Sequence, residues 1–488
     1  MGLQVCVVTL PASQALEATP AYLPMHCKRF LAENKYHRIM IKHLLCLALC
    51  APVLCGAVPA QSATTTALVG GRLIDGFGGT PLDHSVVLIE GDRIKAVGTE
   101  ESLPVPAGAT VISTAGMTLL PGLWDAHVHT YLLGHSDYTY WDKTYGGSPR
   151  LAKEIMPAAA HQLLMAGVTS ARDLGAPLEA IISVRDRINH GEIPGPTLYV
   201  AGPFIQHAPY PGTEIFRWGV NGPDDARKKV KKLAEAGVNI IKMIDQDLMQ
   251  EAEVKAVVEE AHAHNLPVVA HAHRPEEIRR GLKYNVDCFE HTGLATAPGY
   301  PEDILQAIAE RSARGNLGPL FWTPTISVLY NYEYLRDNAL LLDDPGWQLD
   351  VPADIVADIK ASIRHPGQLP YFQLVPLRRP TLENKFHQLE RSGVVMLIGT
   401  DSGVPMNFHS ASTWQEMDTW VNHLGVDPMT TIRAATYWPA VQMKVEKDYG
   451  SISAGKYADI IAVNGDLLRH IDLLQHVNVV VKHGIRYK

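Results

Sequence analysis

The chain has 488 residues, of which 46% are hydrophobic and 19% charged, and its formal net charge is −8. This composition is typical of a folded protein with a large core, and the length exceeds what one small domain usually holds. The negative charge and the lack of a long basic run give no reason to expect a nucleic-acid partner, so that class is set aside.

Residues 1–63 are predicted to form an N-terminal extension and, over about 40–63, an export signal. A basic flank precedes an apolar run over 44–55, and small-residue cleavage sites follow. The apolar run is short for a transmembrane helix, so no stable membrane span is expected after cleavage. We expect translation to start at Met40 and the mature protein to be periplasmic or extracellular. The alternatives are an uncleaved anchor and a lipid-modified cysteine.

Cysteines are concentrated in the same region. Five of the six lie in the first 55 residues, and only Cys288 lies beyond them. Once the N-terminus is set aside, no disulfide framework is possible within one chain.

The two ends of the remaining chain share a β texture. Residues 67–118 are β-branched runs broken by Gly and Asp, which is typical of a small all-β unit. Similar runs return over 448–488. We expect both ends to build one β-sandwich around an inserted domain.

That inserted domain, 119–447, alternates short apolar strands with helical segments. Eight such repeats predict an α/β fold, a (β/α)8 TIM barrel. An open doubly wound sheet is the alternative, but no Gly-rich phosphate-binding motif follows the first strand. The predicted strands are Leu119–His127, Val168–Asp173, Thr197–Ala201, Asn239–Ile244, Pro267–His271, Asp287–His291, Phe321–Thr325 and Val394–Thr400.

Ionisable residues lie in or after five of these strands, where barrel enzymes place their sites. His127 and His129 are two residues apart on the first strand, which aims both imidazoles at one point. Each candidate alone has an ordinary interpretation, such as a snorkelling lysine or a helix N-cap, but together they predict a metal site. The other candidates are Lys242, His271, His273, His291 and Asp401.

The segment Pro121–His129, PGLWDAHVH, resembles the signature of the amidohydrolase superfamily of metal-dependent hydrolases. The resemblance spans about 67–488 and is greatest to the binuclear branch with prolidase-type (Xaa-Pro dipeptidase) and ochratoxinase-type enzymes. The later motifs and the C-terminal signature have counterparts in the expected order at Gly167–Asp173, Lys242, His271, His291, Gly399–Asp401, Gly450–Ile452 and Gly455–Ile460.

The resemblance implies two divalent metal ions, with Zn²⁺ expected from the ligand types. Lys242 would bridge the ions as a carbamate formed with CO₂, because an ammonium only donates hydrogen bonds and cannot bind a metal. Burial in an apolar strand favours the neutral amine that reacts with CO₂. The other implied ligands are His127, His129 and Asp401 for one ion, and His271 and His291 for the second.

The implied reaction is attack on a metal-polarised carbonyl by a hydroxide that bridges the ions. Asp401 would act as general base and then as general acid to the leaving amine. His273 would contact the carbonyl oxygen or lie behind the ligands. A one-metal deaminase is a neighbouring alternative, but such enzymes usually carry a glutamate after the fifth strand, where this chain has Arg274, and lack the lysine found here at 242.

Three long aromatic-rich loops follow barrel strands, at 131–147, around 207–218 and at 327–380. Such loops are typical of lids over an apolar substrate side chain, although ordinary packing explains most of the aromatics. A peptide-like substrate needs a cation for its carboxylate, and Arg217 and Arg274 are the candidates. His207 is a candidate contact of the scissile carbonyl.

The sequence therefore predicts an exported binuclear amidohydrolase that cleaves a small-molecule amide, either a dipeptide, Xaa-Pro especially, or an N-acyl amino acid. A lactonase or cyclic-amide hydrolase of the same superfamily is the closer alternative. A non-catalytic binding protein on the same barrel is the other alternative. The oligomeric state stays open, a homo-oligomer included.

Overall fold

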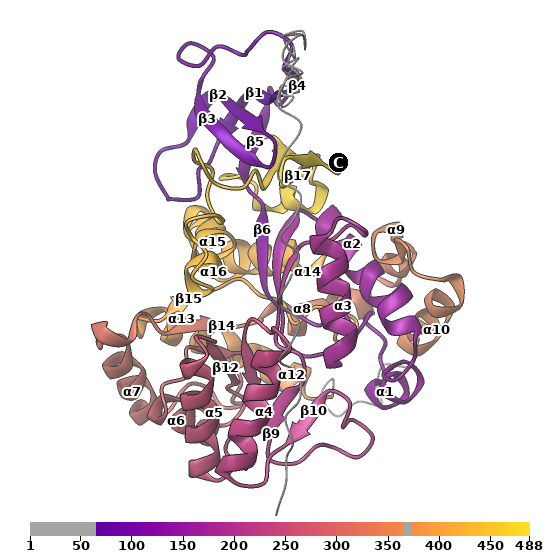
Figure 1. The fold of residues 1–488 in the computed structure, drawn as a ribbon, viewed down its shortest axis with the longest axis vertical. Helices are drawn as coiled ribbons and strands as arrows, with labels where there is room; N and C mark the ends of the chain where they lie inside the picture. Colours follow the sequence, from indigo (N-terminus) through magenta and orange to yellow (C-terminus); the bar gives the residue numbers. More distant parts are fainter. Residues whose placement is uncertain (1–64, 365–372) are drawn as a thin grey trace, which may run out of the picture. The chain divides into compact units, whose positions relative to one another are not determined.

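The computed structural model describes residues 65–364 and 373–488 (Figure 1). The predicted extension and export signal, 1–63, lie outside these ranges, as do the five N-terminal cysteines. Within the described ranges, no helix combines the length and apolar character needed to cross a membrane.

Both ends of the described chain contribute to one eight-stranded sheet, which is mostly antiparallel. The ends meet where Leu120 pairs with Ile461. The apolar run Val86–Ile89 is buried on both faces, because alternate residues pack into separate apolar clusters. The strand order is β18 (Ile485–Arg486), β17 (Val479–Lys482), β16 (Ile460–Asn464), β5 (Met117–Pro121), β1 (Thr65–Leu73), β2 (Leu82–Glu90) and β3 (Arg93–Thr99), with β4 (Thr110–Ser113) paired to β1.

The middle of the chain forms the predicted (β/α)8 barrel. Parallel ladders join β6 to β8 and β11 to β15. Backbone hydrogen bonds of 2.9 Å close the two remaining seams, from Asn239 N to Val200 O and from Ala126 N to Ile398 O. The barrel strands are β6 (Leu123–Val128), β7 (Val168–Asp173), β8 (Thr197–Val200), β11 (Ile241–Met243), β12 (Val268–His271), β13 (Cys288–Glu290), β14 (Phe321–Thr323) and β15 (Val395–Met396).

The predicted first strand, Leu119–His127, is two strands in the structure. Its beginning belongs to β5 of the terminal sheet, and its end belongs to β6 of the barrel. Gly122 lies between them, where a Cβ atom would come within 2.1 Å of the hydroxyl of Thr169. The chain therefore crosses from one sheet to the other at a position that only glycine fits.

The barrel helices follow one another around the outside (Figure 1). In α4, Pro223 occupies the first turn, and the buried residues Ala226, Val230 and Leu233 share one helix face. The helices of the outer ring are α2 (Met156–Met165), α3 (Leu178–Asn189), α4 (Pro223–Glu235), α5 (Glu251–Ala263), α6 (Pro275–Lys283), α7 (Glu302–Ser312), α13 (Leu382–Arg391), α14 (Ser412–Asp418), α15 (Pro428–Ala434) and α16 (Tyr437–Gln442).

The described part of the predicted loop at 327–380 is mostly helical, so that expectation was wrong. Its apolar residues recur at helical spacing, and Ile355, Ile359 and Ile363 are all buried. Its helices are α8 (Ser327–Asp337), α9 (Pro345–Gln348), α10 (Ala353–Ile363) and α12 (Val375–Arg378). Other short elements are β9 (Phe204–Gln206), β10 (Arg217–Gly219), α1 (Tyr138–Tyr145), η1 (Leu151–Ile155), η2 (Gly315–Leu317), η3 (Ala339–Asp343), η5 (Arg379–Thr381), η6 (Thr419–His423) and η7 (Ile471–His476).

Candidate metal centre

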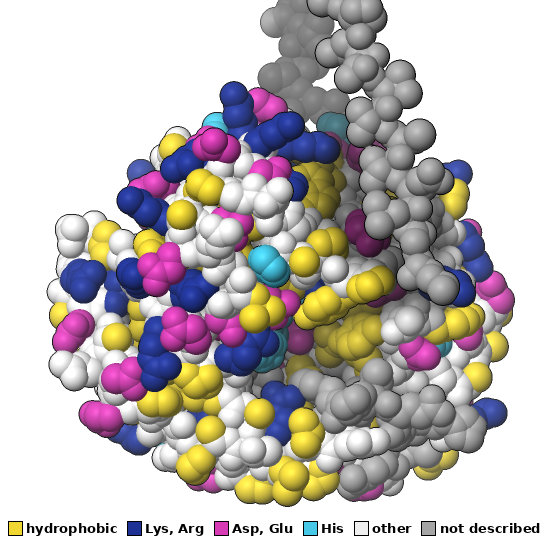
Figure 2. All heavy atoms as spheres, turned by 90° about the horizontal axis from the view of Figure 1, so that it is seen from below, with side chains coloured by type: hydrophobic (Ala, Val, Ile, Leu, Met, Phe, Trp, Pro, Cys, Tyr) yellow, Lys and Arg dark blue, Asp and Glu magenta, His cyan; other side chains and the backbone are white. Residues whose placement is uncertain are grey.

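The carboxyl ends of the barrel strands bring five of the predicted metal ligands, together with His273, into two groups. The ligand atoms of His127, His129 and Asp401, here called the first half-site, lie within 4.8 Å of one another. Those of the second half-site, His271, His273 and His291, do the same. The rings of His127 and His291 are 4.9 Å apart, which joins the two half-sites. On the face seen in Figure 2, histidine side chains lie near the centre among hydrophobic and charged side chains.

In the first half-site, Asp401 is the anion that faces two imidazoles. Its Oδ1 lies 3.1 Å from His129 Nε2 and 3.5 Å from His127 Nε2. Burial favours the neutral acid, but the two imidazoles outweigh it and lower the pKa of Asp401 to about 2. The carboxylate is therefore ionised at neutral pH and available as a ligand or a base.

Lys242 lies in the middle of β11, fully buried, and its charge acts on both half-sites. Burial lowers the pKa of its amine to about 8. Within the described residues, neither Lys242 Nζ nor His127 Nε2 has a hydrogen-bond partner. Buried polar atoms without partners are costly. An imidazole nitrogen, a carboxylate and a modified lysine are suitable donors for divalent ions, so these residues fit a metal centre.

The second half-site is a stack of imidazoles. The rings of His273 and His291 are 4.5 Å apart and 9° from parallel, and the ring of His271 lies 4.7 Å from that of His273. Burial lowers the pKa values of His271 and His291 well below the ordinary value. All three rings therefore favour the neutral form that binds metal ions.

Two of the predicted ligands have an uncommon backbone conformation. His291 has φ 73° and Asp401 has φ 57°, both in the left-handed region that favours glycine. His291 directly follows β13, and Asp401 lies in the segment that follows β15. Such local strain often accompanies functional positions, because the side chain must be aimed where regular strand geometry would not put it.

The sequence assigned no role to a buried carboxylate and a buried guanidinium that lie behind the first half-site. His127 Nδ1 is 2.8 Å from Glu290 Oε2, and Arg172 donates to Glu290 Oε1 at 2.8 Å. Asp125 accepts from the backbone N–H of His127 at 3.1 Å. The available signal was a charged residue in each of two short, fully buried strands, Arg172 in β7 and Glu290 at the end of β13.

The two predicted substrate cations differ in their surroundings. Arg217 lies over three aromatic rings, with its guanidinium carbon 4.6 Å from the ring centre of Tyr210 and 5.0 Å from that of Phe204. The Phe204 ring is in turn 6.0 Å from that of His129. Arg217 therefore belongs to an aromatic wall that reaches the first half-site.

Arg274 is held by acidic side chains instead. It binds Asp245 at 2.8 Å, Asp247 at 2.5 Å and Glu277 at 2.9 Å. His207 is exposed, and no side-chain contact among the described residues links it to either half-site. Arg274 directly follows His273, and its charge also contributes to the lowered pKa of that imidazole, but its guanidinium is occupied by the three carboxylates.

Arg378, at the end of α12, is a cation that the sequence reasoning missed. Burial lowers the pKa of His273 to about 4, and the charge of Arg378 contributes next. Arg378 therefore lies near the second half-site. Its position in a long inserted segment gave no sequence signal for this proximity.

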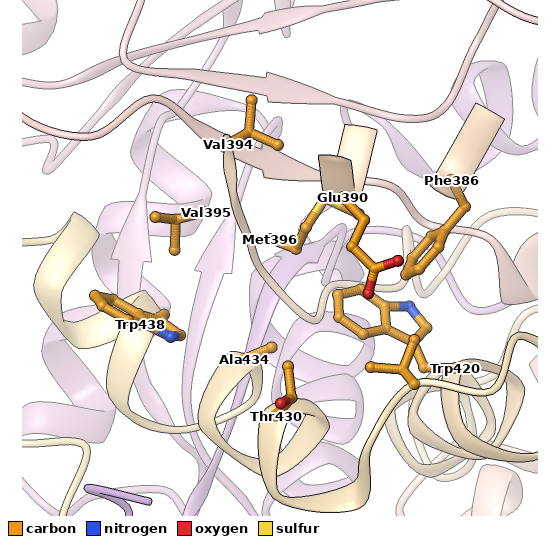
Figure 3. Close-up of a pocket in the computed structure, with 10 residues that line it drawn as sticks. Phe386, Glu390, Val394, Val395, Met396, Trp420, Thr430, Ala434 and Trp438 are labelled. Atoms are coloured by element: carbon orange, nitrogen blue, oxygen red, sulfur yellow. The ribbon is translucent and has the colours of Figure 1, made fainter. Parts of the chain in front are cut away.

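A separate cavity of about 240 Å³ lies against β15, between α13 and the segment from η6 to α16 (Figure 3). Its wall is largely apolar and includes the indole rings of Trp420 and Trp438. None of its lining residues belongs to either half-site. The cavity is therefore not part of the candidate metal centre.

The amidohydrolase family model matches residues 118–312 and 377–486, more than half of the chain, so the chain belongs to that family. The ochratoxinase of Aspergillus niger is 25% identical over 462 residues, which cover 86% of this chain and 85% of that protein. These similarities identify a hydrolase of carbon–nitrogen bonds.

Solved structures have the same fold. A Xaa-Pro dipeptidase with methionine bound in its active site has a TM-score of 0.66 and 25% identity, covering 87% of this chain and all of that one. A molinate hydrolase has a TM-score of 0.68 and 23% identity, covering 88% of this chain and 95% of that one. The predicted membership of the amidohydrolase family and the predicted barrel fold are thereby confirmed.

Proposed function

We propose that the protein is a binuclear metal-dependent hydrolase that cleaves the amide bond of a dipeptide, Xaa-Pro especially, or of an N-acyl amino acid. The observation that carries this proposal is a buried lysine amine that has no hydrogen-bond partner among the described residues and whose charge acts on both groups of metal-ligand atoms. A structural lysine would have a carboxylate or carbonyl partner at that depth.

The residues divide between two ions, for which Zn²⁺ suits the donor set. Lys242, as a carbamate formed with CO₂, would contribute oxygen to both. When bound, the ions supply Lewis acidity and a water of lowered pKa. The proposed ligands are His127, His129 and Asp401 for one ion, and His271 and His291 for the other.

Two side chains carry the proposed proton transfer and orientation. Asp401 takes a proton from the attacking water and delivers it to the nitrogen of the leaving amine, since its carboxylate lies at the centre of the first half-site. His273 is neutral and stacks on His291 beside the ligands. From there it donates a hydrogen bond to the carbonyl oxygen of the substrate.

Arg217 is the better supported of the two proposed carboxylate contacts. Its aromatic wall of Phe204, Tyr210 and Phe216 offers an apolar surface for a substrate side chain beside the cation. Arg274 is already neutralised by its three carboxylates, so a substrate carboxylate would have to displace one of them. His207, proposed to approach the carbonyl, has the weakest support because it is exposed.

A hydrolysis panel tests the proposal. The Zn²⁺-loaded protein is assayed against aminoacyl-prolines, other dipeptides, N-acyl amino acids and lactones. Turnover is expected on aminoacyl-prolines, other dipeptides or N-acyl amino acids, and the class with the highest turnover identifies the substrate type. Turnover confined to lactones or cyclic amides would show that the protein is a lactonase or cyclic-amide hydrolase and not a peptidase or acylase. Stoichiometric metal with no turnover on any substrate would favour a binding protein.

We also propose that the protein is exported, on the evidence of the apolar run and cleavage sites within residues 40–63. N-terminal sequencing of the natural protein tests this. A mature chain that begins close to residue 63 is expected, and one that contains residues 1–39 would contradict it.

A further inference from the structure

Glu290, the last residue of β13, is fully buried in the centre of the barrel with both carboxylate oxygens engaged. Oε2 faces His127 Nδ1 at 2.8 Å. Oε1 accepts from Arg172 at 2.8 Å and from the thiol of Cys288 at 3.3 Å. The carboxylate thus links one candidate metal ligand to one buried cation.

Arg172 is fixed from several sides. It donates to the backbone oxygen of Ala126 at 2.5 Å, to Gln442 Oε1 at 3.0 Å and to Thr323 Oγ1 at 3.0 Å. These partners come from β6, α16 and β14, and Arg172 itself lies in β7. The guanidinium therefore has one position, and it fixes the carboxylate of Glu290 in turn.

The contact determines which nitrogen of His127 carries the proton. A carboxylate only accepts hydrogen bonds, and pairing with Arg172 favours its ionised form. Nδ1 of His127 must therefore donate, which leaves Nε2 as the bare nitrogen. Nε2 is the atom that faces Asp401 and has no hydrogen-bond partner within the described ranges.

We propose that Arg172 and Glu290 are a positioning pair that holds His127 in the metal-binding tautomer and orientation, and so sets the metal affinity of the first half-site. This inference rests on the proposed metal centre. An alternative role in stability alone accounts for the pair less well. Buried ion pairs contribute little net stability compared with apolar packing, because removing two charges from water is costly.

The test replaces the carboxylate without changing its size. Glu290→Gln loses the charge that binds Arg172 and one of the two accepting oxygens. Outer partners of metal-bound histidines typically change metal affinity by about 10- to 100-fold, so we expect a loss of that size at one of the two metal ions. Affinity is measured by Zn²⁺ competition with a chromogenic chelator. The visible spectrum of the Co²⁺-loaded protein should also change.

Glu416 offers a matched control. It too is a fully buried carboxylate, with hydrogen bonds from Ile326 N, Ser327 N and Trp420 Nε1, and none of these partners belongs to either half-site. Glu416→Gln is expected to lower thermal stability while leaving both metal affinities and the Co²⁺ spectrum unchanged.

A second variant keeps the test decisive if Glu290→Gln does not fold. Glu290→Asp retains the charge that Arg172 requires but is one methylene too short to hold both partners, so it should fold and still weaken the metal. Wild-type affinity and spectrum in the variants that fold would overturn the inference while leaving the proposed function intact. A wild-type protein that binds no metal would overturn both.

Discussion

The two halves of the candidate metal centre are supported by different chemistry. In the first half-site, His127 donates to the ionised Glu290, which Arg172 holds from behind, and Asp401 adds a second carboxylate. In the second half-site, His291 Nδ1 has the neutral hydroxyl of Thr325 at 2.9 Å, and the carboxylate of Asp401 is farther away, at 4.0 Å. Charge-assisted hydrogen bonds are the stronger kind, so the first half-site should hold its ion more firmly.

The side chains of the first half-site are also less exposed than those of the second. His127 is completely buried, whereas His271 and His273 are only partly buried. We therefore propose that the first half-site would retain its ion and that the second, more open half-site would meet the substrate. The charge of Lys242 acts on histidines of both half-sites.

The largest expected effect comes from removing the residue that the two half-sites share. Lys242→Ala should reduce turnover to background and release metal from both half-sites, because neither would retain its bridging oxygen. Turnover and metal content per chain are the measurements. Lys242→Glu should recover part of the metal content by restoring an oxygen ligand. Lys482→Ala, at a buried lysine of the terminal sheet, is the control. Near-normal turnover in Lys242→Ala would contradict the proposed bridging role of Lys242.

Asp401→Asn should lower kcat by roughly 10²- to 10⁴-fold, the usual contribution of a general base. The amide cannot take a proton, although it still offers an oxygen to a metal ion. Steady-state kinetics and metal content measured on the same sample separate the two roles. Full metal with unchanged kcat would show that another group transfers the proton.

Arg217→Gln should raise KM for substrates with a free carboxylate by about 10- to 100-fold, because a hydrogen bond to a charged group contributes about 1.5–3 kcal/mol. Substrates whose carboxylate is amidated should be little affected. Arg274→Gln serves as the matched control, since this guanidinium is occupied by Asp245, Asp247 and Glu277. The reverse pattern would exchange the roles of the two arginines.

Graded chelation tests the comparison between the half-sites directly. Metal should leave in two steps. The ion of the second half-site should leave first, and activity should disappear with it. Glu290→Gln should bring the two steps closer together by weakening the first half-site. Simultaneous release of both ions from the wild-type protein would mean that the different supports do not produce different affinities.

The smallest expected effect is a change in thermal stability from a histidine that contacts the segment before β13. His262 contacts Asp287, the residue before β13, at 2.8 Å, and this hydrogen bond raises the pKa of His262. A raised histidine pKa stabilises the folded state below the unfolded value of about 6.5, and the contribution is lost as pH rises through the folded pKa. His262→Gln should therefore lower Tm at acidic pH and have little effect at alkaline pH. An equal effect at all pH values would contradict this.

The strands and the ligand cluster could be predicted because each depends on local pattern. His127 and His129 lie on one strand, and the other ligands lie where the barrel rule places site residues. The pair of Arg172 and Glu290 could not be predicted, because its partners are 118 positions apart and meet only inside the closed barrel. The neutralisation of Arg274 was missed because two of its three carboxylate partners, Asp245 and Asp247, are 29 and 27 positions away and follow another strand. The helices of the long insertion were missed although Ile355, Ile359 and Ile363 carried their helical spacing.

Native mass spectrometry of the protein purified without chelator tests the central claim most directly. We expect two divalent ions and one CO₂ per chain, with the CO₂ and at least one ion lost in Lys242→Ala. A fully active protein with one ion or none, or with two ions and no CO₂, would contradict the proposed binuclear centre.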